Sequence, residues 1–385
     1  MIKLFVTGDN HIGKKYDRYP EIKDQLIESR FRCLQDMVEK AKEEACSIFI
    51  VTGDLFDSIN TVKVGDVKRV VEILAGFDGV VLILPGNHDY YTGDEKVWKD
   101  FESALSVQEH NIILMNEWRE YTFDVGEDKV VIYPAYCQSK HSKENNLRWI
   151  KERDIKQDGV LNIGIAHGAI EGITPDMKEE YFLMKESELA AIPVDVWLLG
   201  HTHIPYPNVL KSDSDTSGYK IFNAGTHEQT DLHNNTEGNA FIIMLDKQGN
   251  NAKVMARKVI TGKVRFYDIE VVVKPDSDTA LFDMLHKALE GKNKMAVVRV
   301  TVSGTVKQSE YQNKEKIYRA ILGEYLTFEK RDHELSEEIT IEKIRDEYAE
   351  TSFASRFLEQ LIAQPVELQM AYRLLQECKE KEHFK

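Results

Sequence analysis

The chain has 385 residues, enough for a large hydrophobic core and for two or three domains. Its 42% hydrophobic residues lie in short runs such as VVLIL at 80–84, which are too short to span a bilayer. The formal net charge of −15 argues against a protein that coats nucleic acid, but not against a nucleic-acid enzyme whose bound cations offset ligand carboxylates.

The cysteines and the N-terminus bear on the compartment. The four cysteines show no paired spacing, so we expect reduced thiols and neither a disulfide framework nor a zinc module. The opening segment MIKLFVTGD has too little apolar length for a signal peptide. These features predict a cytoplasmic protein without membrane association.

Up to about residue 245, short apolar strands alternate with amphipathic segments. Strands are predicted at IKLFVTG (2–8), SIFIVTG (47–53) and VVLILPG (80–86), with helices over 21–45, 64–76 and 95–105. A strand-rich stretch follows, from NIILM at 111–115 to AFIIMLD at 240–246. This order predicts an α/β layered fold with mixed sheets.

The pattern changes at about residue 262. The strands KVRFYDIEVVV and MAVVRVTVSG, with helices near 278–290 and 311–323, suggest a small α+β unit. The charged stretch KRDHELSEE at 330–338 is interpreted as a linker. Beyond it, an apolar stripe from Ile341 to Ile362 predicts one helix, and a second is expected after Pro365. We therefore divide the chain into residues 1–261, 262–330 and 331–385. The last two helices are either a packed terminal hairpin or a docking module.

Five predicted strands end in residue types that bind metals. They are followed by D-x-H at 9–11, G-D-x-x-D at 53–57, G-N-H-D at 86–89, a histidine at 167 and G-H-x-H at 200–203. In an open α/β sheet, functional groups collect beyond the carboxyl ends of the strands. A single D-x-H means little, but five such strand ends containing five of the twelve histidines predict a site.

The ligand types indicate the chemistry of this site. Carboxylate, amide and imidazole ligands without cysteine suit ions such as manganese, iron or zinc. There are too many ligands for one ion, so we expect two ions bridged by one carboxylate. Such a pair activates a water for in-line displacement at phosphorus. The sequence offers no obvious protein nucleophile, so metal-dependent phosphoester hydrolysis is predicted.

In this order, the motifs resemble those of the calcineurin-like metallophosphoesterase superfamily over residues 1–245. The resemblance implies a layered αββα core with two mixed sheets and two metal ions. One ion is expected on Asp9, His11, Asp54 and His203, and the second on Asp54, Asn87, His167 and His201.

The resemblance also assigns a role to the histidine of the third motif. His88 is expected to face the scissile phosphate as general acid or charge stabiliser. Asp57 matches a superfamily position that often pairs with this histidine, so an Asp57–His88 dyad is expected, with the carboxylate holding the imidazolium charged. Asp57 could instead be a turn or helix-cap residue.

The superfamily contains phosphatases, phosphodiesterases and nucleases, so the core alone does not fix the substrate. The sequence segments GDLFD, PGNHDYY and NAGTHEQTD, and the total length of the chain, are similar to those of SbcD-type DNA-repair nucleases. This similarity implies a manganese-dependent nuclease acting on duplex ends and hairpins, a DNA-capping domain at 262–330 and a homodimer formed near 62–76 and 95–106. It also implies C-terminal helices that dock on an SbcC-type coiled-coil ATPase. GHTH is common throughout the superfamily and carries no SbcD signal.

Substrate contacts are predicted in the segment GKKYDRYP at 13–20. Basic residues interleaved with aromatics suit phosphate contact and base stacking, which makes Lys14, Lys15, Tyr16 and Arg18 candidates. A polar surface loop would have the same composition. Two rival functions also stay open, a phosphatase or phosphodiesterase for small molecules or phosphoproteins, and a non-enzymatic binding subunit.

Overall fold

The strand and helix pattern of the first 245 residues folds into two β-sheets packed face to face. The structure is a computed structural model that describes residues 1–107, 109–172, 180–207 and 218–383. It divides into two units, residues 1–267 with 295–297, and residues 268–294 with 298–385. None of its helices in the described ranges is long and apolar enough to cross a membrane.

The first sheet contains the strands that precede three of the predicted motifs. Its order is β11-β10-β1-β2-β3-β4. The strands β1 (Ile2–Thr7), β2 (Ile48–Val51), β3 (Val80–Ile83) and β4 (Ile112–Leu114) run parallel. The antiparallel hairpin of β10 (Asn239–Gln248) and β11 (Asn251–Ile260) completes the sheet beside β1. The strand β11 was not predicted.

The second sheet has the order β5-β6-β7-β8-β9. Its strands are β5 (Tyr121–Val125), β6 (Asp128–Ala135), β7 (Val160–His167), β8 (Val196–Gly200) and β9 (Ile221–Asn223). Only the β5–β6 pairing is antiparallel. Both sheets are therefore mixed, as predicted.

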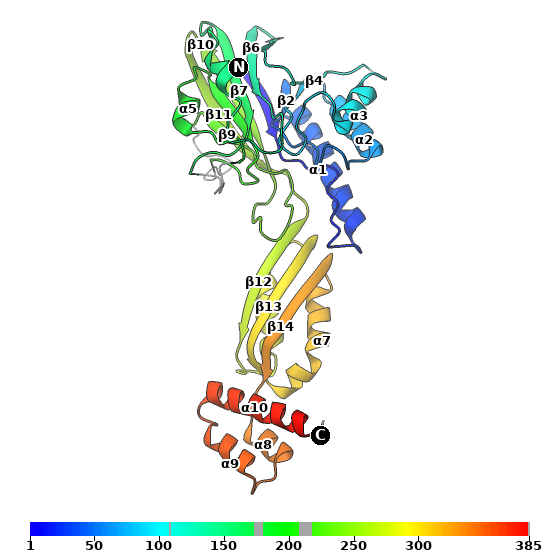
Figure 1. Ribbon diagram of the computed structural model, residues 1–385, viewed down its shortest axis with the longest axis vertical. Helices are drawn as coiled ribbons and strands as arrows, with labels where there is room; N and C mark the ends of the chain where they lie inside the picture. The colour runs from blue at the N-terminus through cyan, green and yellow to red at the C-terminus, as the bar shows by residue number, and fades with distance from the viewer. Residues whose placement is uncertain (108, 173–179, 208–217, 384–385) are drawn as a thin grey trace. The chain divides into compact units, whose positions relative to one another are not determined.

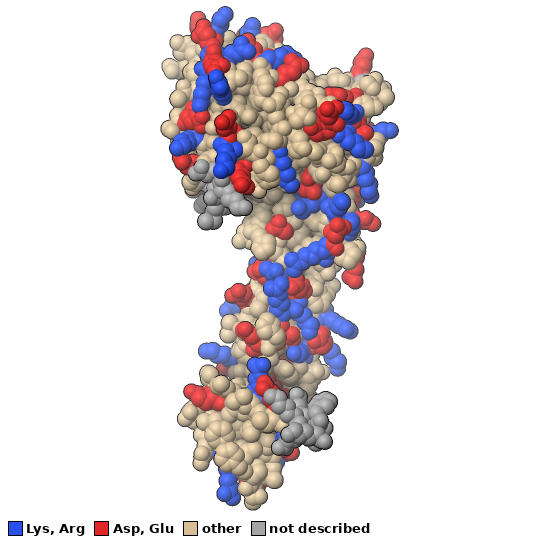
Figure 2. All heavy atoms as spheres, in the orientation of Figure 1, with Lys and Arg blue, Asp and Glu red and all other residues tan. Residues whose placement is uncertain are grey.

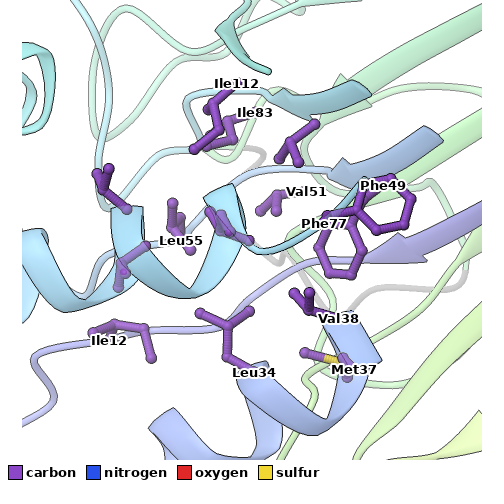
Figure 3. Close-up of a cluster of buried hydrophobic side chains, with 14 of the residues drawn as sticks. Ile12, Leu34, Met37, Val38, Phe49, Val51, Leu55, Phe77, Ile83 and Ile112 are labelled. Carbon is purple, nitrogen blue, oxygen red and sulfur yellow. The ribbon is translucent and has the colours of Figure 1, made fainter. Parts of the chain in front are cut away.

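Helices cover the outer faces of the sheets. Alternate residues of β1 divide between two cores, because neighbouring strand residues face opposite sides. Leu4 packs between the sheets, whereas Phe5 packs under the helices. On that side lie α1 (Lys23–Glu43), α2 (Val64–Ala75) and α3 (Lys96–Leu105), and Figure 3 shows part of this core.

The second sheet is covered by short helices that the sequence did not predict, α4 (Arg148–Lys151) and α5 (Glu186–Ala190). Ile150 of α4 and Leu189 of α5 pack on the outer side chains of this sheet. The layers are therefore helix, sheet, sheet and helix, which confirms the predicted α/β class and its αββα order.

The second unit contains a three-stranded sheet of order β12-β13-β14. It is built from β12 (Arg265–Val273), α6 (Ala280–Leu289), β13 (Ala296–Val306), α7 (Gln308–Leu322) and β14 (Thr327–Glu337), and α7 lies beside β14 (Figure 1). The prediction of a linker at 330–338 was wrong. Charged residues follow one another there in an edge strand, where they remain partly or fully exposed.

Three helices follow β14, not the predicted two. They are α8 (Ile341–Glu347), α9 (Phe353–Gln360) and α10 (Pro365–His383). The stripe from Ile341 to Ile362 is split because the side chain of Ser352 accepts a hydrogen bond from Ser355 N and caps a new helix. Buried apolar residues join the helices. The predicted boundaries at 261 and 330 stay predictions, although β14 crosses the second one.

Candidate metal centre

The predicted ligands meet where the carboxyl ends of the two sheets come together. Asp9 and His11 follow β1, Asp54 follows β2, and Asn87 follows β3. His167 is the last residue of β7, and the residues 201–203 follow β8. Gly8 and Thr226 form a β-bridge at this edge. Strands remote in the sequence thereby deliver their terminal side chains to one place.

The backbone is strained at these strand ends. Four predicted ligands have positive φ angles, 49° at Asp9, 45° at His11, 52° at Asp54 and 100° at His201. Such conformations cost a non-glycine residue about 1–3 kcal/mol each and cluster at functional sites. The surrounding structure must therefore enforce them.

Two motif glycines allow the close approach of the ligands. A Cβ atom on Gly53, whose φ is 111°, would lie 2.1 Å from Nδ1 of His167. A Cβ atom on Gly86 would lie 2.3 Å from Oδ1 of Asp54. The glycines of the second and third motifs are thus required by space, and Gly53 is required by its conformation as well.

The first ligand group comprises Asp9, His11 and His203, whose ligand atoms all lie within 4.8 Å of one another. The Nε2 atoms of His11 and His203 are 3.0 Å apart. Burial lowers the pKa of both histidines to about 4, so both are neutral at pH 7. Carboxylate and neutral imidazole donors converging in this way fit a divalent cation.

The second group surrounds Asn87. Its Oδ1 lies 3.0 Å from Nε2 of His167 and 3.0 Å from Nδ1 of His201. On the other side of the His167 ring, Nδ1 donates a hydrogen bond to the carbonyl of Thr52 at 2.9 Å, and this contact directs Nε2 into the site. This amide and imidazole set also fits a divalent cation.

Asp54 lies between the two groups. Its Oδ2 is 3.4 Å from Nε2 of His167 and 3.8 Å from Nε2 of His11, and its side chain is 2% exposed. Its Oδ1 accepts a hydrogen bond from the backbone N–H of His88 at 2.8 Å. This is the position that a bridging carboxylate requires.

The electrostatics of the buried site follow from the crowding of these groups. Burial opposes the charge of Asp54, but the neighbouring histidines, His167 foremost, together hold the pKa of Asp54 well below its ordinary value. Burial would lower the pKa of His167, yet the adjacent Asp54 raises it to about 9. Burial raises the pKa of Asp9 to about 6. His167 therefore carries a proton that cation binding would displace.

The predicted Asp57–His88 dyad takes a different form. Nδ1 of His88 lies 3.2 Å from the backbone carbonyl of Asp57, whereas the Asp57 carboxylate lies 3.3 Å from Nδ1 of His11. The rings of His11 and His88 are neighbours, with centroids 4.8 Å apart, and the carboxylate contacts that of His11. Asp57, His11 and His88 also form a third group of potential ligands within 4.8 Å.

The side chains predicted to bind substrate at residues 14–18 differ in their exposure. Lys14 is half-buried; against the effect of burial, His11 and to a smaller extent Lys14 hold the pKa of the Asp57 carboxyl below its usual range. Lys15 and Arg18 are exposed. The prediction for Tyr16 was wrong, because the side chain is buried and its hydroxyl accepts a hydrogen bond from Arg30 at 3.1 Å.

Several functional neighbours were missed by sequence reasoning. Thr52 contributes only its carbonyl oxygen, for which side-chain patterns give no signal. Asp89 was named with the third motif as a metal-type residue, but its buried carboxylate instead accepts hydrogen bonds from the backbone N–H groups of Phe56 and Gly86, and so holds the second and third motif loops together. The burial of Arg30 could have been predicted, because this residue lies four positions from both Leu26 and Leu34 on the apolar face of α1.

A cavity of about 670 Å³ opens beside the first ligand group. It is lined by His201, His203, Lys258 and the segment 230–237. Two of the predicted ligands, His201 and His203, therefore lie in the wall of this cavity.

A profile of the calcineurin-like phosphoesterase family matches residues 2–205, more than half of the chain. The chain belongs to this family. It is accordingly a metal-dependent phosphoester hydrolase that uses divalent ions, and the superfamily prediction is confirmed.

Solved structures with similar folds include three phosphoesterases, each 12% identical to the chain. A dimetal phosphatase from Danio rerio has a TM-score of 0.37, with 66% of this chain and 98% of that chain covered. A purple acid phosphatase from Lupinus luteus seeds has a TM-score of 0.35, with 58% of this chain and 43% of that chain covered. A calcineurin-like phosphoesterase from Bacillus subtilis has a TM-score of 0.32, with 67% of this chain and 89% of that chain covered.

Proposed function

We propose that the chain is a manganese-dependent DNA nuclease of the SbcD type that hydrolyses phosphodiesters with an activated water. The observation that carries the hydrolytic part is the convergence of two ligand groups on the buried carboxylate of Asp54. The choice of DNA rests on the resemblance of GDLFD, PGNHDYY and NAGTHEQTD, and on the chain's continuation beyond the family core into a second unit.

Seven side chains would hold two ions. One ion would be held by Asp9, His11, Asp54 and His203, and the other by Asp54, Asn87, His167 and His201. Bound divalent ions supply charge stabilisation at phosphoryl oxygens and acidify a water.

His88 would assist as general acid or as charge stabiliser. A backbone carbonyl can only accept, so the contact with Asp57 O places the proton of a neutral His88 on Nδ1. Nε2 is then the atom that can face a phosphoester. When protonated, it can donate to the oxygen that leaves as the P–O bond breaks. Asp57 would orient this ring through its backbone rather than through its carboxylate.

Lys14, Lys15 and Arg18 would contact DNA phosphates near the site, since their charges suit a polyanion. The net charge of −15 limits how much DNA surface the chain offers by itself. The proposed SbcC-type ATPase would supply the rest, and a capping role of residues 262–330 would help to place duplex ends or hairpins.

The C-terminal helices support the proposed partner. They expose Phe353, Val366, Met370 and Leu374, with 52–78% of each residue accessible. Figure 2 shows few charged side chains over this part of the visible face. Exposed apolar patches of this kind mark interaction surfaces. Docking on a coiled-coil ATPase is the proposed use.

A homodimer formed by α2 and α3 is proposed from the family resemblance, because these helices flank the third motif. The cytoplasmic location stays a prediction. It is supported by the cysteines Cys33, Cys46, Cys137 and Cys378, which are free in the described residues.

The deciding experiment is digestion of end-labelled linear duplex and hairpin DNA with Mn²⁺, alongside His88→Ala and a chelator control. Bis-(4-nitrophenyl) phosphate serves as a small diester for the same preparations. We expect chelator-sensitive cutting that falls roughly 10²–10⁴-fold in the variant. Circular dichroism confirms that the variant is folded.

Two other outcomes separate the rivals. Hydrolysis of the small diester without DNA cutting, even with the ATPase partner added, would favour a small-molecule or phosphoprotein phosphoesterase. Metal binding without turnover of any phosphoester would indicate a binding subunit.

A further inference from the structure

Arg30 is a buried cation directly beneath the loop that carries two of the proposed ligands. The residue is 2% exposed on the third turn of α1. Its Nε and Nη2 atoms donate to the carbonyl of Asn10, at 2.9 and 2.5 Å, and its Nη1 donates to the hydroxyl of Tyr16 at 3.1 Å. Asn10 lies between Asp9 and His11, so the guanidinium holds the centre of this loop.

The segment Thr226–Glu228 holds the same loop from another side. The hydroxyl of Thr226 lies 2.9 Å from the carbonyl of Asp9 and 3.5 Å from Nη2 of Arg30. Nε2 of His227 lies 3.2 Å from the carbonyl of Arg30. The Glu228 carbonyl accepts from Nη1 of Arg30 at 3.4 Å. All three residues therefore contact either α1 or the ligand loop.

The Glu228 carboxylate anchors this arrangement. It accepts hydrogen bonds from the hydroxyl of Ser29 at 2.7 Å and from the backbone N–H groups of Lys263 and Val264 at 3.1 and 3.0 Å. Burial opposes the charge of Arg30, but Tyr16 and Glu228 hold the pKa of Arg30 above its ordinary value. The guanidinium is thus a permanent charge with fixed partners.

We propose that Arg30, supported by Thr226, is a positioning residue that sets the Asp9–His11 loop for cation binding. The peptide units on both sides of Asn10 must be fixed, because Asp9 and His11 both adopt positive φ. Arg30 and Thr226 fix them through the carbonyls of Asn10 and Asp9. The inference rests on the proposed placement of an ion by Asp9, His11 and His203.

The test compares Arg30→Lys and Thr226→Val with Arg32→Lys. Lysine keeps the charge of Arg30 but not the planar fork that binds several acceptors, and valine keeps the shape of Thr226 without its hydroxyl. Arg32 lies on the same helix with a 65% exposed side chain, and is the matched control. The dissociation constant for Mn²⁺ is measured by electron paramagnetic resonance, and the melting temperature of the metal-free protein is recorded for each variant.

We expect the Arg30 and Thr226 variants to bind Mn²⁺ roughly 10- to 100-fold more weakly than the parent, as for other residues that orient metal ligands. The Arg32 variant should bind like the parent. Parental Mn²⁺ affinity in both test variants would overturn the proposal, even with a lowered melting temperature, because a purely structural role would produce that result. If Arg30→Lys does not fold, Thr226→Val decides alone.

The parent protein separates this inference from the nuclease proposal. Mn²⁺ binding without DNA cutting by the parent would refute the nuclease and leave the role of Arg30 intact. Absence of Mn²⁺ binding by the parent would refute the ion placement and the role of Arg30 with it.

Discussion

The two units of the molecule depart from ordinary burial in opposite ways. The first unit buries polar and charged side chains at its strand ends, among them Asp9, Asp54 and His167. The second exposes large apolar side chains on its last two helices, such as Phe353 and Val366. Buried polar groups and exposed apolar patches are the two departures that carry information.

The difference indicates what each unit lacks. Crowded carboxylates and neutral imidazoles are stabilised by cations, so the first unit is completed by a small charged ligand. An exposed apolar surface is stabilised by covering it, so under the proposed function the second unit would be completed by another protein. Changes in one unit should therefore alter one of these functions and leave the other intact.

The largest effect is expected from Asp54→Asn. The change keeps the shape of the side chain but removes the charge between the two ligand groups. Loss of the ions would remove several kcal/mol of transition-state stabilisation, so hydrolysis of bis-(4-nitrophenyl) phosphate should fall roughly 10³-fold or more. The exposed Asp94 offers the control Asp94→Asn. Retained Mn²⁺ content with parental turnover would show that Asp54 is no bridge.

A second prediction concerns the apolar surface of α10. Val366→Asp together with Met370→Asp should weaken binding to an SbcC-type ATPase by roughly 10²-fold or more, since each covered apolar side chain contributes about 1.5–3 kcal/mol. Arg373→Asp on the same helix is the matched control. Binding is measured by calorimetry.

In the same α10 variant, Mn²⁺-dependent hydrolysis of the small diester should stay at the parental rate. A parallel loss of both functions would contradict the separation of the two units. Unchanged binding would remove α10 from the docking surface.

The same contrast explains what the sequence could predict. Asp9, Asp54 and Asn87 were predicted because parallel strands bring their carboxyl ends to one edge whatever the loops do. The path of the Asp57 side chain depends on the crowding of His11 and His88, which strand order does not specify. Tyr16 was misplaced because the composition of its segment does not reveal a buried Arg30 across the fold.

The second unit was harder to predict for a related reason. Its strand β14 is an edge strand with partly exposed charged residues, so it lacks the apolar run that marked the inner strands. The break between α8 and α9 depends on the Ser352 cap, a local signal within a continuous apolar stripe. Sequence patterns identify strands that carry an apolar run, and they fail for β14, whose residues are mostly charged.

A third prediction concerns the pH dependence of stability in the first unit. Burial, with Arg30 and His11 nearby, holds the pKa of His227 well below its ordinary value. Below about pH 6.5 the unfolded chain takes up a proton that folded His227 does not, so the free energy of unfolding falls as the pH falls. The loss should approach about 1.4 kcal/mol per pH unit, and no loss is expected above pH 6.5.

His227→Gln should lack this contribution. Urea unfolding of the metal-free protein at pH 5.5, 6.5 and 7.5 measures it, with the exposed His233→Gln as control. The parent should lose stability relative to the variant only at the lowest pH. Identical pH profiles would show that His227 is protonated in the folded protein.

The smallest effect is expected from the cap of α9. Ser352→Ala removes the hydroxyl that accepts from Ser355 N at 3.1 Å and should cost about 1 kcal/mol of local stability. Ser352→Asp keeps an acceptor and should retain most of it. Amide hydrogen exchange in α9 measures the loss, which should not extend to the amides of β1 or to Mn²⁺ binding. A loss shared by β1 would show that the two units unfold together, and the contrast between them would then describe surfaces of one cooperative structure.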